Sequence, residues 1–197
     1  NIAIITGYKS KYLENFIKKL DIGIKTKIIR NSNYKLGSIV SLVCGESFFK
    51  LKDDLIIMDA DVLYHKKILE KLINSKKKNC LLLDKNFEDG YEPVKVCIKN
   101  NKVCDFGKVV KKTFSYCGES VGFFKFSHET SIMLLNEAKI IMKQNNKAMY
   151  EDAITKIINK KKINISFEDI TNIPWTEIDF KKDLILARKK IVNKIDE

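Results

Sequence analysis

A short run of aliphatic residues that ends in two closely spaced carboxylates constrains the fold of this chain more than any other stretch. Leu55 to Met58 are too few for a helix and show no alternation of polar and apolar residues, which predicts a fully buried strand. Asp59 and Asp61 follow directly. In open α/β sheets ligands bind beyond the carboxyl ends of the strands, so carboxylates there can hold a hard cation such as Mg2+. The alternative is that one of them only caps a helix at His65 to Asn74.

Strands and helices alternate along most of the chain. Short apolar runs, which predict strands, are followed by stretches whose apolar residues recur with helical spacing. This alternation predicts an α/β fold with a mostly parallel mixed sheet flanked by helices. The predicted strands cover residues 2–6, 26–30, 55–58, 80–83, 122–126 and about 163–167, and the predicted helices about 11–20, 38–49, 65–74, 129–143, 151–159 and 181–194.

The pattern changes between residues 90 and 126. Val94 to Ile98 and Lys102 to Phe106 alternate polar and apolar residues around a turn at residues 99–101. This spacing predicts a β-hairpin that covers one side of a site.

Composition indicates one soluble globular domain of 197 residues, with 45% hydrophobic and 31% charged residues. No apolar stretch is long enough to span a bilayer and no signal peptide is visible, so a cytoplasmic location is expected. The cysteines lack the close pairing of zinc sites, which predicts free, buried thiols in a reducing compartment. They are Cys44, Cys80, Cys97, Cys104 and Cys117.

The formal net charge of +12 would attract a polyanion, a membrane surface or a phosphorylated small molecule. The lysines are scattered through every segment, and no aromatic residues interleave with a basic stripe. That distribution argues against nucleic acid as the main partner.

Eight short stretches, in one order along the chain, resemble the Mg2+-dependent nucleotidyltransferases, and most closely the phosphocholine and 2-aminoethylphosphonate cytidylyltransferases. The most specific of them is Trp175-Thr176-Glu177-Ile178-Asp179-Phe180, followed by Asp183-Leu184. The others are Ile5 to Tyr8, Asn31 to Tyr34, Ser38 to Leu42, Leu55 to Val62, Glu92 to Val96, Gly118 to Phe123 and Tyr150 to Ala153.

This resemblance implies a Rossmann-like fold and the transfer of CMP from CTP to a small phosphonate or phospho-alcohol, with release of pyrophosphate. It also implies that Asp61 and Asp179 are the two metal carboxylates. The chemistry agrees, because a cation held by two carboxylates stabilises the charge that develops on the α-phosphate. The attacking oxygen is already anionic, so little proton transfer is required.

Other positions carry over from the resemblance as further candidates. Lys95 and Lys108 would neutralise phosphate charge on the acceptor side, unless they are solvated hairpin lysines. Acidic residues in the acceptor pocket would suit a cationic amine. Ser38 and Ser41 have the alternative of plain N-cap and helix-surface serines, and Glu151 and Asp152 that of acids at a helix start. The candidate substrate-binding residues are Ser38, Ser41, Asp59, Asp84, Glu119, Ser120, Glu151, Asp152 and Glu177.

The chain departs from the family pattern at its start. The family opens with a strand and a glycine-rich loop, containing an Arg and later a Pro-Lys pair, which cradles the triphosphate through backbone N–H groups. These 197 residues contain no such loop. We therefore expect a single nucleotidyltransferase domain, residues 1–197, that lacks this N-terminal segment as printed and is inactive without it. A homodimer or a fusion to an upstream domain stays open.

Two other functions stay open on the sequence. A nucleotide-sugar-dependent glycosyltransferase of related fold also uses Asp-x-Asp after a buried strand, although the Trp-x-Glu-Ile-Asp element argues against it. A basic anion-binding module without catalysis would bind RNA or anionic membrane through its lysines.

Overall fold

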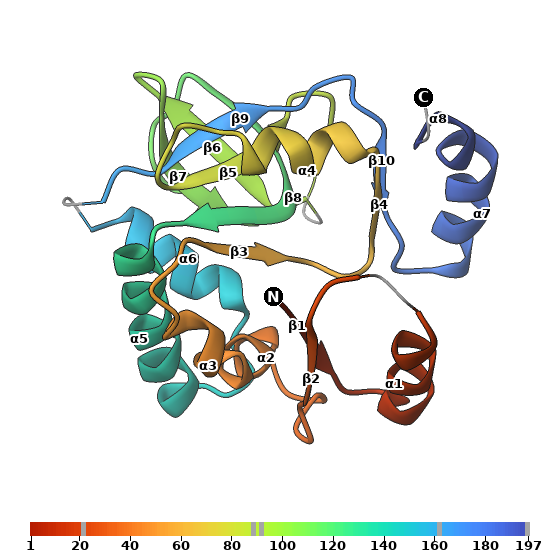
Figure 1. Cartoon of the computed structure of the whole chain (residues 1–197). Helices are drawn as coiled ribbons and strands as arrows, with labels where there is room; N and C mark the ends of the chain where they lie inside the picture. The colour runs from red at the N-terminus through yellow and green to blue at the C-terminus, as the bar shows by residue number, and fades with distance from the viewer. Residues whose placement is uncertain (21–22, 88–89, 91–92, 161–162, 196–197) are drawn as a thin grey trace. The chain divides into compact units, whose positions relative to one another are not determined.

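The computed structural model describes residues 1–20, 23–87, 90, 93–160 and 163–195. The chain divides into two compact units, Asn1–Asp53 with His128–Ile157 and Asp54–Ser127 with Ile158–Glu197. Each is an α/β arrangement in which helices pack beside strands, as the alternation of the sequence predicts (Figure 1). Of the resembling stretch Glu92 to Val96, Glu92 lies outside the described residues.

The first unit contains a pair of parallel strands and a group of helices. Strands β1 (Ile2–Thr6) and β2 (Thr26–Arg30) pair in parallel and are connected through helix α1 (Ser10–Lys19). The predicted helix at 38–49 is two helices, α2 (Ser38–Cys44) and α3 (Glu46–Phe49), because the poor helix former Gly45 ends the first. Both pack against α5 (His128–Gln144), and α6 (Tyr150–Ile158) completes the group.

Helix α1 has the predicted apolar face, but that face is not buried within the described chain. Tyr12, Phe16 and Leu20 are 80%, 54% and 46% exposed. Spacing alone identifies such a face, whereas its burial depends on what packs against it.

The second unit is built on a mixed sheet of six strands. Its order is β7 (Lys102–Gly107), β6 (Lys95–Lys99), β8 (Tyr116–Phe126), β5 (Cys80–Asp84) and β9 (Ser166–Asp169), with β3 (Leu55–Met58) also paired to β8. Pairs β5–β9 and β1–β2 are parallel, and the other described pairs are antiparallel. The sheet is therefore mixed, with fewer parallel pairs than predicted. The hairpin is confirmed as β6 and β7, with Asn100 and Asn101 at positive φ in its turn.

Strand β3 is less buried than its sequence predicts. Leu55, Ile56 and Ile57 are partly buried, and Met58 is 36% exposed. Within the described residues β3 pairs on one side only, with β8, which explains the difference.

A separate two-stranded ribbon lies beside the sheet. It pairs β4 (Val62–Tyr64) with β10 (Trp175–Glu177) in antiparallel fashion, and Figure 1 shows the two strands side by side. Helix α4 (Lys66–Ile73) follows β4 and is capped by His65, whose Nδ1 accepts a hydrogen bond from the N–H of Lys67 at 3.0 Å. Neither Asp59 nor Asp61 is the cap, so the helix-cap alternative for them is wrong. The last helices are α7 (Lys181–Lys190) and α8 (Val192–Ile195).

The expectation of five free thiols is wrong for two of them. Cys97 on β6 and Cys117 on β8 form a disulfide, while Cys44, Cys80 and Cys104 are free. The two bonded residues are 20 positions apart, and only the register of β6 against β8 places them opposite each other.

One described core cluster lies between the sheet, α4 and the ribbon. It contains Ile68, Leu72, Cys80, Leu82, Val121, Phe123 and Ile170, and Tyr64 and Trp175 pack against its edge. The ribbon is therefore held against the core through the side chains of Tyr64 and Trp175. None of the helices in the described residues is sufficiently long and apolar to cross a bilayer.

Replacing Leu82 with alanine tests this core. Leu82 is fully buried, so Leu82→Ala should lower the free energy of unfolding by about 3 kcal/mol, through lost burial and a residual cavity. Urea unfolding measures the change. Val109→Ala is the control, since Val109 is 72% exposed and its truncation should cost less than about 0.5 kcal/mol. Equal losses in both variants would contradict the described core.

Candidate active site

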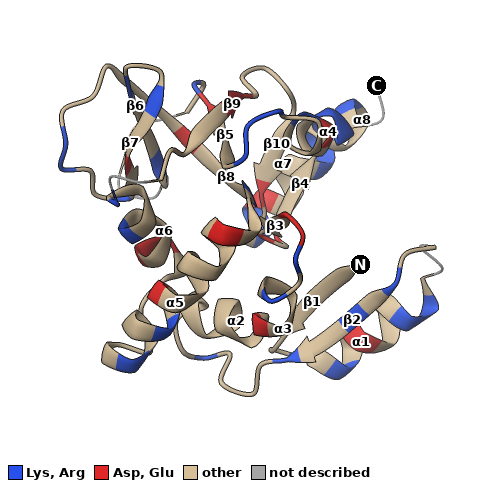
Figure 2. Cartoon of the chain, turned by 60° about the vertical axis from the view of Figure 1, so that its left-hand side comes forward, with Lys and Arg blue, Asp and Glu red and all other residues tan. Residues whose placement is uncertain are grey.

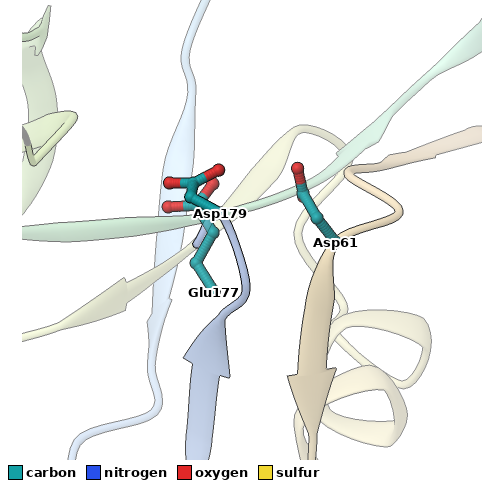
Figure 3. Close-up of side chains that lie close together, drawn as sticks. All are labelled: Asp61, Glu177 and Asp179. Atoms are coloured by element: carbon teal, nitrogen blue, oxygen red, sulfur yellow. The ribbon is translucent and has the colours of Figure 1, made fainter. Parts of the chain in front are cut away.

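Three carboxylates from distant parts of the sequence meet at one end of the ribbon. Asp61, Glu177 and Asp179 can each direct one oxygen so that these atoms all lie within 4.8 Å of one another. Figure 3 shows Asp61 just before β4, and Glu177 and Asp179 at the end of β10 and just beyond it. All three side chains are exposed to solvent. The arrangement could supply three oxygen ligands to one divalent cation.

Backbone pairing brings these carboxylates together. Glu177 lies opposite Val62 in the β4–β10 register, and the N–H of Ile178 donates to the carbonyl oxygen of Asp61 at 2.9 Å. Main-chain hydrogen bonds therefore hold Asp61 and Asp179 at the adjoining ends of β4 and β10. The two residues are 118 positions apart in the sequence (179 − 61 = 118).

The charge of this cluster is poorly compensated. Partial desolvation of its carboxyl group, together with repulsion from Asp179, Asp61 and Asp59, raises the pKa of Glu177 to about 7. The ammonium group of Lys108 acts in the opposite direction and lowers that pKa. Lys108, which the sequence analysis places at the site, is therefore close enough to act on the carboxylate cluster.

Asp59 is held against strand β8 by a glycine. Its N–H donates to the carbonyl oxygen of Gly122 at 3.1 Å, and a Cβ added to Gly122 would lie 2.1 Å from the Asp59 carboxylate. Gly122 has φ of +73° and lies where β8 exchanges its partner β6 for β3. Its N–H donates to the hydroxyl of Ser120 at 3.2 Å. The missing side chain of Gly122 therefore leaves the space that the carboxylate of Asp59 occupies. Asp59 lies two residues before Asp61 in the sequence.

An acidic cavity of about 680 Å³ adjoins the cluster. Five of its lining residues carry carboxylates, namely Asp84, Glu119, Glu177, Asp179 and Asp183, and two carry amines, Lys182 and Lys194. The excess of negative charge contrasts with the net charge of +12 for the chain, whose Lys and Arg are spread over helices, strands and loops (Figure 2). The cavity therefore favours a cationic occupant.

Two of the lining carboxylates, those of Asp84 and Glu119, belong to a row of charged residues on adjacent strands, and Lys95 continues that row beside the cavity. Glu119 on β8 lies opposite Asp84 on β5 and opposite Lys95 on β6. Desolvation, followed by repulsion from Glu177 and Asp84, raises the pKa of Glu119 to about 7. Asp84 is 7% exposed and accepts hydrogen bonds from Trp175 Nε1 at 2.7 Å and from the N–H of Asn86 at 2.8 Å.

Four predicted residues belong to the other unit and make local contacts there. The hydroxyl of Ser38 accepts from the N–H of Tyr150, and that of Ser41 accepts from Asn31 Nδ2. The other two lie in the first turn of α6, where the Asp152 carboxylate accepts from the N–H of Met149 and the carbonyl oxygen of Glu151 accepts from Thr155 Oγ1.

Sequence reasoning missed three features of the site. Trp175 appeared only within the resembling Trp-x-Glu-Ile-Asp stretch, but it lines the cavity and bonds Asp84. The exposed ring of Phe180 also lines it, and Lys182 Nζ lies 5.4 Å from the centroid of that ring. The role of Gly122 was also missed. A glycine within a strand pattern signals a bulge or a close approach, so that signal was available.

Comparison with known proteins finds similarity in both sequence and fold. No family model matches the chain. The CTP:phosphoglutamine cytidylyltransferase of Campylobacter jejuni is 27% identical over 209 aligned positions, which cover 96% of this chain and 81% of that protein.

The inositol-1-phosphate CTP transferase from T. maritima has a TM-score of 0.77 at 19% identity, with 99% of this chain and 76% of that one covered. The CTP:phosphocholine cytidylyltransferase from Streptococcus pneumoniae has a TM-score of 0.72 at 17% identity, with 96% and 77% covered. The chain therefore has the α/β fold of these nucleotidyltransferases.

Replacing Gly122 with alanine should disturb the site through Asp59. The added Cβ would collide with the Asp59 carboxylate, and a positive φ is strained for any residue with a side chain, so we expect a loss of about 2 kcal/mol or more. Gly23→Ala is a matched control, because Gly23 has φ of +61° and an added Cβ meets no atom of the described chain within 4 Å. Thermal or urea unfolding measures both variants. Equal losses would show that contact with Asp59 is unimportant.

Removing the charge of Glu119 should stabilise the protein at high pH. Its pKa is raised from 4.5 to about 7, so ionisation costs folding free energy above about pH 7, and this cost is absent below pH 4.5. Without divalent cations, Glu119→Gln should therefore gain on the order of 2 kcal/mol over the wild type at pH 8, and nothing from this source at pH 4. Urea unfolding at both pH values measures the gain, and a gain independent of pH would contradict the assignment.

Proposed function

We propose that the protein is a CTP-dependent cytidylyltransferase that transfers CMP to the phosphate or phosphonate group of a small acceptor. The observation that carries the proposal is the meeting of Asp61, Glu177 and Asp179 beside an acidic cavity. The likeness to cytidylyltransferases in sequence and fold supports it.

In this reaction an anionic oxygen of the acceptor forms a bond to the α-phosphorus of CTP. The bond from that phosphorus to the oxygen bridging to the β-phosphorus breaks, and pyrophosphate leaves. No proton needs to be removed from the acceptor, so the reaction requires positioning and charge stabilisation more than a general base.

The carboxylate cluster fits a magnesium ion. Asp61 and Asp179 would hold it, with Glu177 adjacent, because carboxylate oxygens are the ligands that this hard cation prefers. When bound, the ion would offset the negative charge of the triphosphate and stabilise the transition state. A bound cation would relieve the repulsion that Asp179, Asp61 and Asp59 exert on Glu177.

The lysines at the site would act on the phosphate groups. Lys108 lowers the pKa of Glu177, and this supports a role for its ammonium group in offsetting phosphate charge beside the cluster. Lys95 lies opposite Glu119 across β6 and β8, at the border between the acidic cavity and the acceptor side.

The acceptor in this proposal carries a cationic amine, as 2-aminoethylphosphonate and phosphocholine do. Glu119 and the other cavity carboxylates would attract the amine, and the exposed ring of Phe180 would offer a cation–π surface. The position of Lys182 Nζ, 5.4 Å from the centroid of that ring, supports a cation-binding role for its face.

Incubation of the full-length protein with Mg2+, CTP and candidate acceptors tests this function. We expect pyrophosphate release with 2-aminoethylphosphonate or phosphocholine, at a kcat/KM at least tenfold above that with inositol 1-phosphate, which carries no cationic group. Phosphoglutamine belongs in the same panel. Asp61→Asn and Asp179→Asn should each lower kcat by about 100-fold or more while the protein remains folded, because the charge stabilisation is lost.

Four outcomes would contradict the proposal. Full activity in either aspartate variant would refute the metal-ligand roles of Asp61 and Asp179. Preference for an acceptor without a cationic group would refute the proposed amine-bearing acceptor. Turnover of a nucleotide sugar without pyrophosphate would indicate a glycosyltransferase, and binding to RNA or anionic vesicles that ignores Asp61 would indicate a basic binding module.

A further inference from the structure

Asp84 is a buried carboxylate with both oxygens engaged by protein donors. It ends β5, it is 7% exposed, and it receives the indole N–H of Trp175 on one oxygen and the N–H of Asn86 on the other. A buried carboxylate costs much free energy unless it is hydrogen-bonded, so these bonds are part of the folded structure. They also occupy the oxygens that would otherwise face a ligand in the cavity.

The bond to Trp175 connects the main sheet to the ribbon. β5 lies inside the six-stranded sheet, whereas β4 and β10 form a sheet of their own. Trp175 opens β10 and lies opposite Tyr64, so its side chain reaches from the ribbon to the end of β5. The nearby hydrogen bond from Asn86 Nδ2 to Asn172 Oδ1, at 2.7 Å, involves the segment that precedes β10 and does not hold β10 itself.

Strand β10 is short, so an anchor at its first residue adds to the hold that its pairing with β4 provides. It has three residues, and Glu177 is the last of them, with Asp179 two positions further on. A shift or rotation of so short a strand would move both carboxylates relative to Asp61, since side chains alternate faces along a strand. An anchor at its first residue therefore bears directly on the geometry of the cluster.

We propose that Asp84 is a positioning residue: through Trp175 it fixes β10 so that Glu177 and Asp179 face Asp61 at a distance that one divalent cation can bridge. The inference rests on the metal assignment of the proposed function. It gives Asp84 a role behind the site in place of contact with the acceptor. Hydrogen bonds that orient the ligands of a metal commonly set its affinity, and here the bond would act on Glu177 and Asp179 through the backbone that follows Trp175.

Two single variants and their combination separate the hydrogen bond from the charge. Asp84→Ala removes both, whereas Trp175→Phe keeps the carboxylate of Asp84 and a ring at position 175 but removes the indole N–H. The dissociation constant for Mn2+ is measured by electron paramagnetic resonance of free Mn2+, without CTP or acceptor. We expect each variant to weaken Mn2+ binding by about tenfold, and the double variant to be no weaker than Asp84→Ala.

A spectroscopic readout follows the bond itself. Trp175 is the single tryptophan among these 197 residues, and Trp175→Phe identifies its indole N–H signal in a nitrogen–proton correlation spectrum. Asp84→Ala should shift that signal upfield, because the proton loses a carboxylate acceptor. Thermal unfolding of each variant establishes that the affinities are compared between folded proteins.

The outcomes distinguish this inference from the proposed function. Wild-type Mn2+ affinity in Trp175→Phe with weaker binding in Asp84→Ala would mean that charge acts rather than the bond, and would overturn the inference. Unchanged affinity in both variants would overturn it as well and leave the cytidylyltransferase proposal intact. Weaker binding in both, in a protein that transfers no CMP, would support the inference and refute the proposed reaction.

Discussion

The pairing of β4 with β10 is the constraint on which the site depends. It is a short ribbon, yet it places carboxylates from opposite ends of the second unit's sequence at one point. The backbone bond from Ile178 to Asp61 extends the pairing past the last residue of β10 and holds the two aspartates beside each other. Without this pairing, like charges would separate, because nothing in their mutual electrostatics favours contact.

The elements of the fold were largely predictable because their signals are local. Leu55 to Met58, Cys80 to Asp84 and the hairpin at 95–107 carry apolar runs or alternation that a single strand explains. Pairing partners are not local. β8 contacts β6, β5 and β3, and nothing in its sequence states that one strand will serve three neighbours. The same reason hid the disulfide between Cys97 and Cys117.

The candidate site was accessible from the sequence through resemblance rather than through pattern. Asp61 was conspicuous at the end of an apolar run, but Asp179 follows a short polar strand that periodicity could not single out. Its convergence with Asp61 was an implication of the Trp-x-Glu-Ile-Asp element, and the ribbon supplies the physical cause. The place of Trp175 in the cavity wall was not predicted, because its side chain both packs against the core and lines the cavity.

The chain concentrates negative charge where its composition would not suggest it. A net charge of +12 favours anionic ligands at long range, including a nucleoside triphosphate, while the cavity next to the cluster is acidic. Under the proposed function, such an arrangement would suit two substrates of opposite local character, a polyphosphate attracted by the whole protein and a cationic group received by the cavity. The raised pKa values of Glu119 and Glu177 express the free-energy cost of ionising partly desolvated carboxylates that lie close together. A ligand that brings positive charge would relieve this cost, so part of its binding free energy is already stored in the repulsion between the carboxylates.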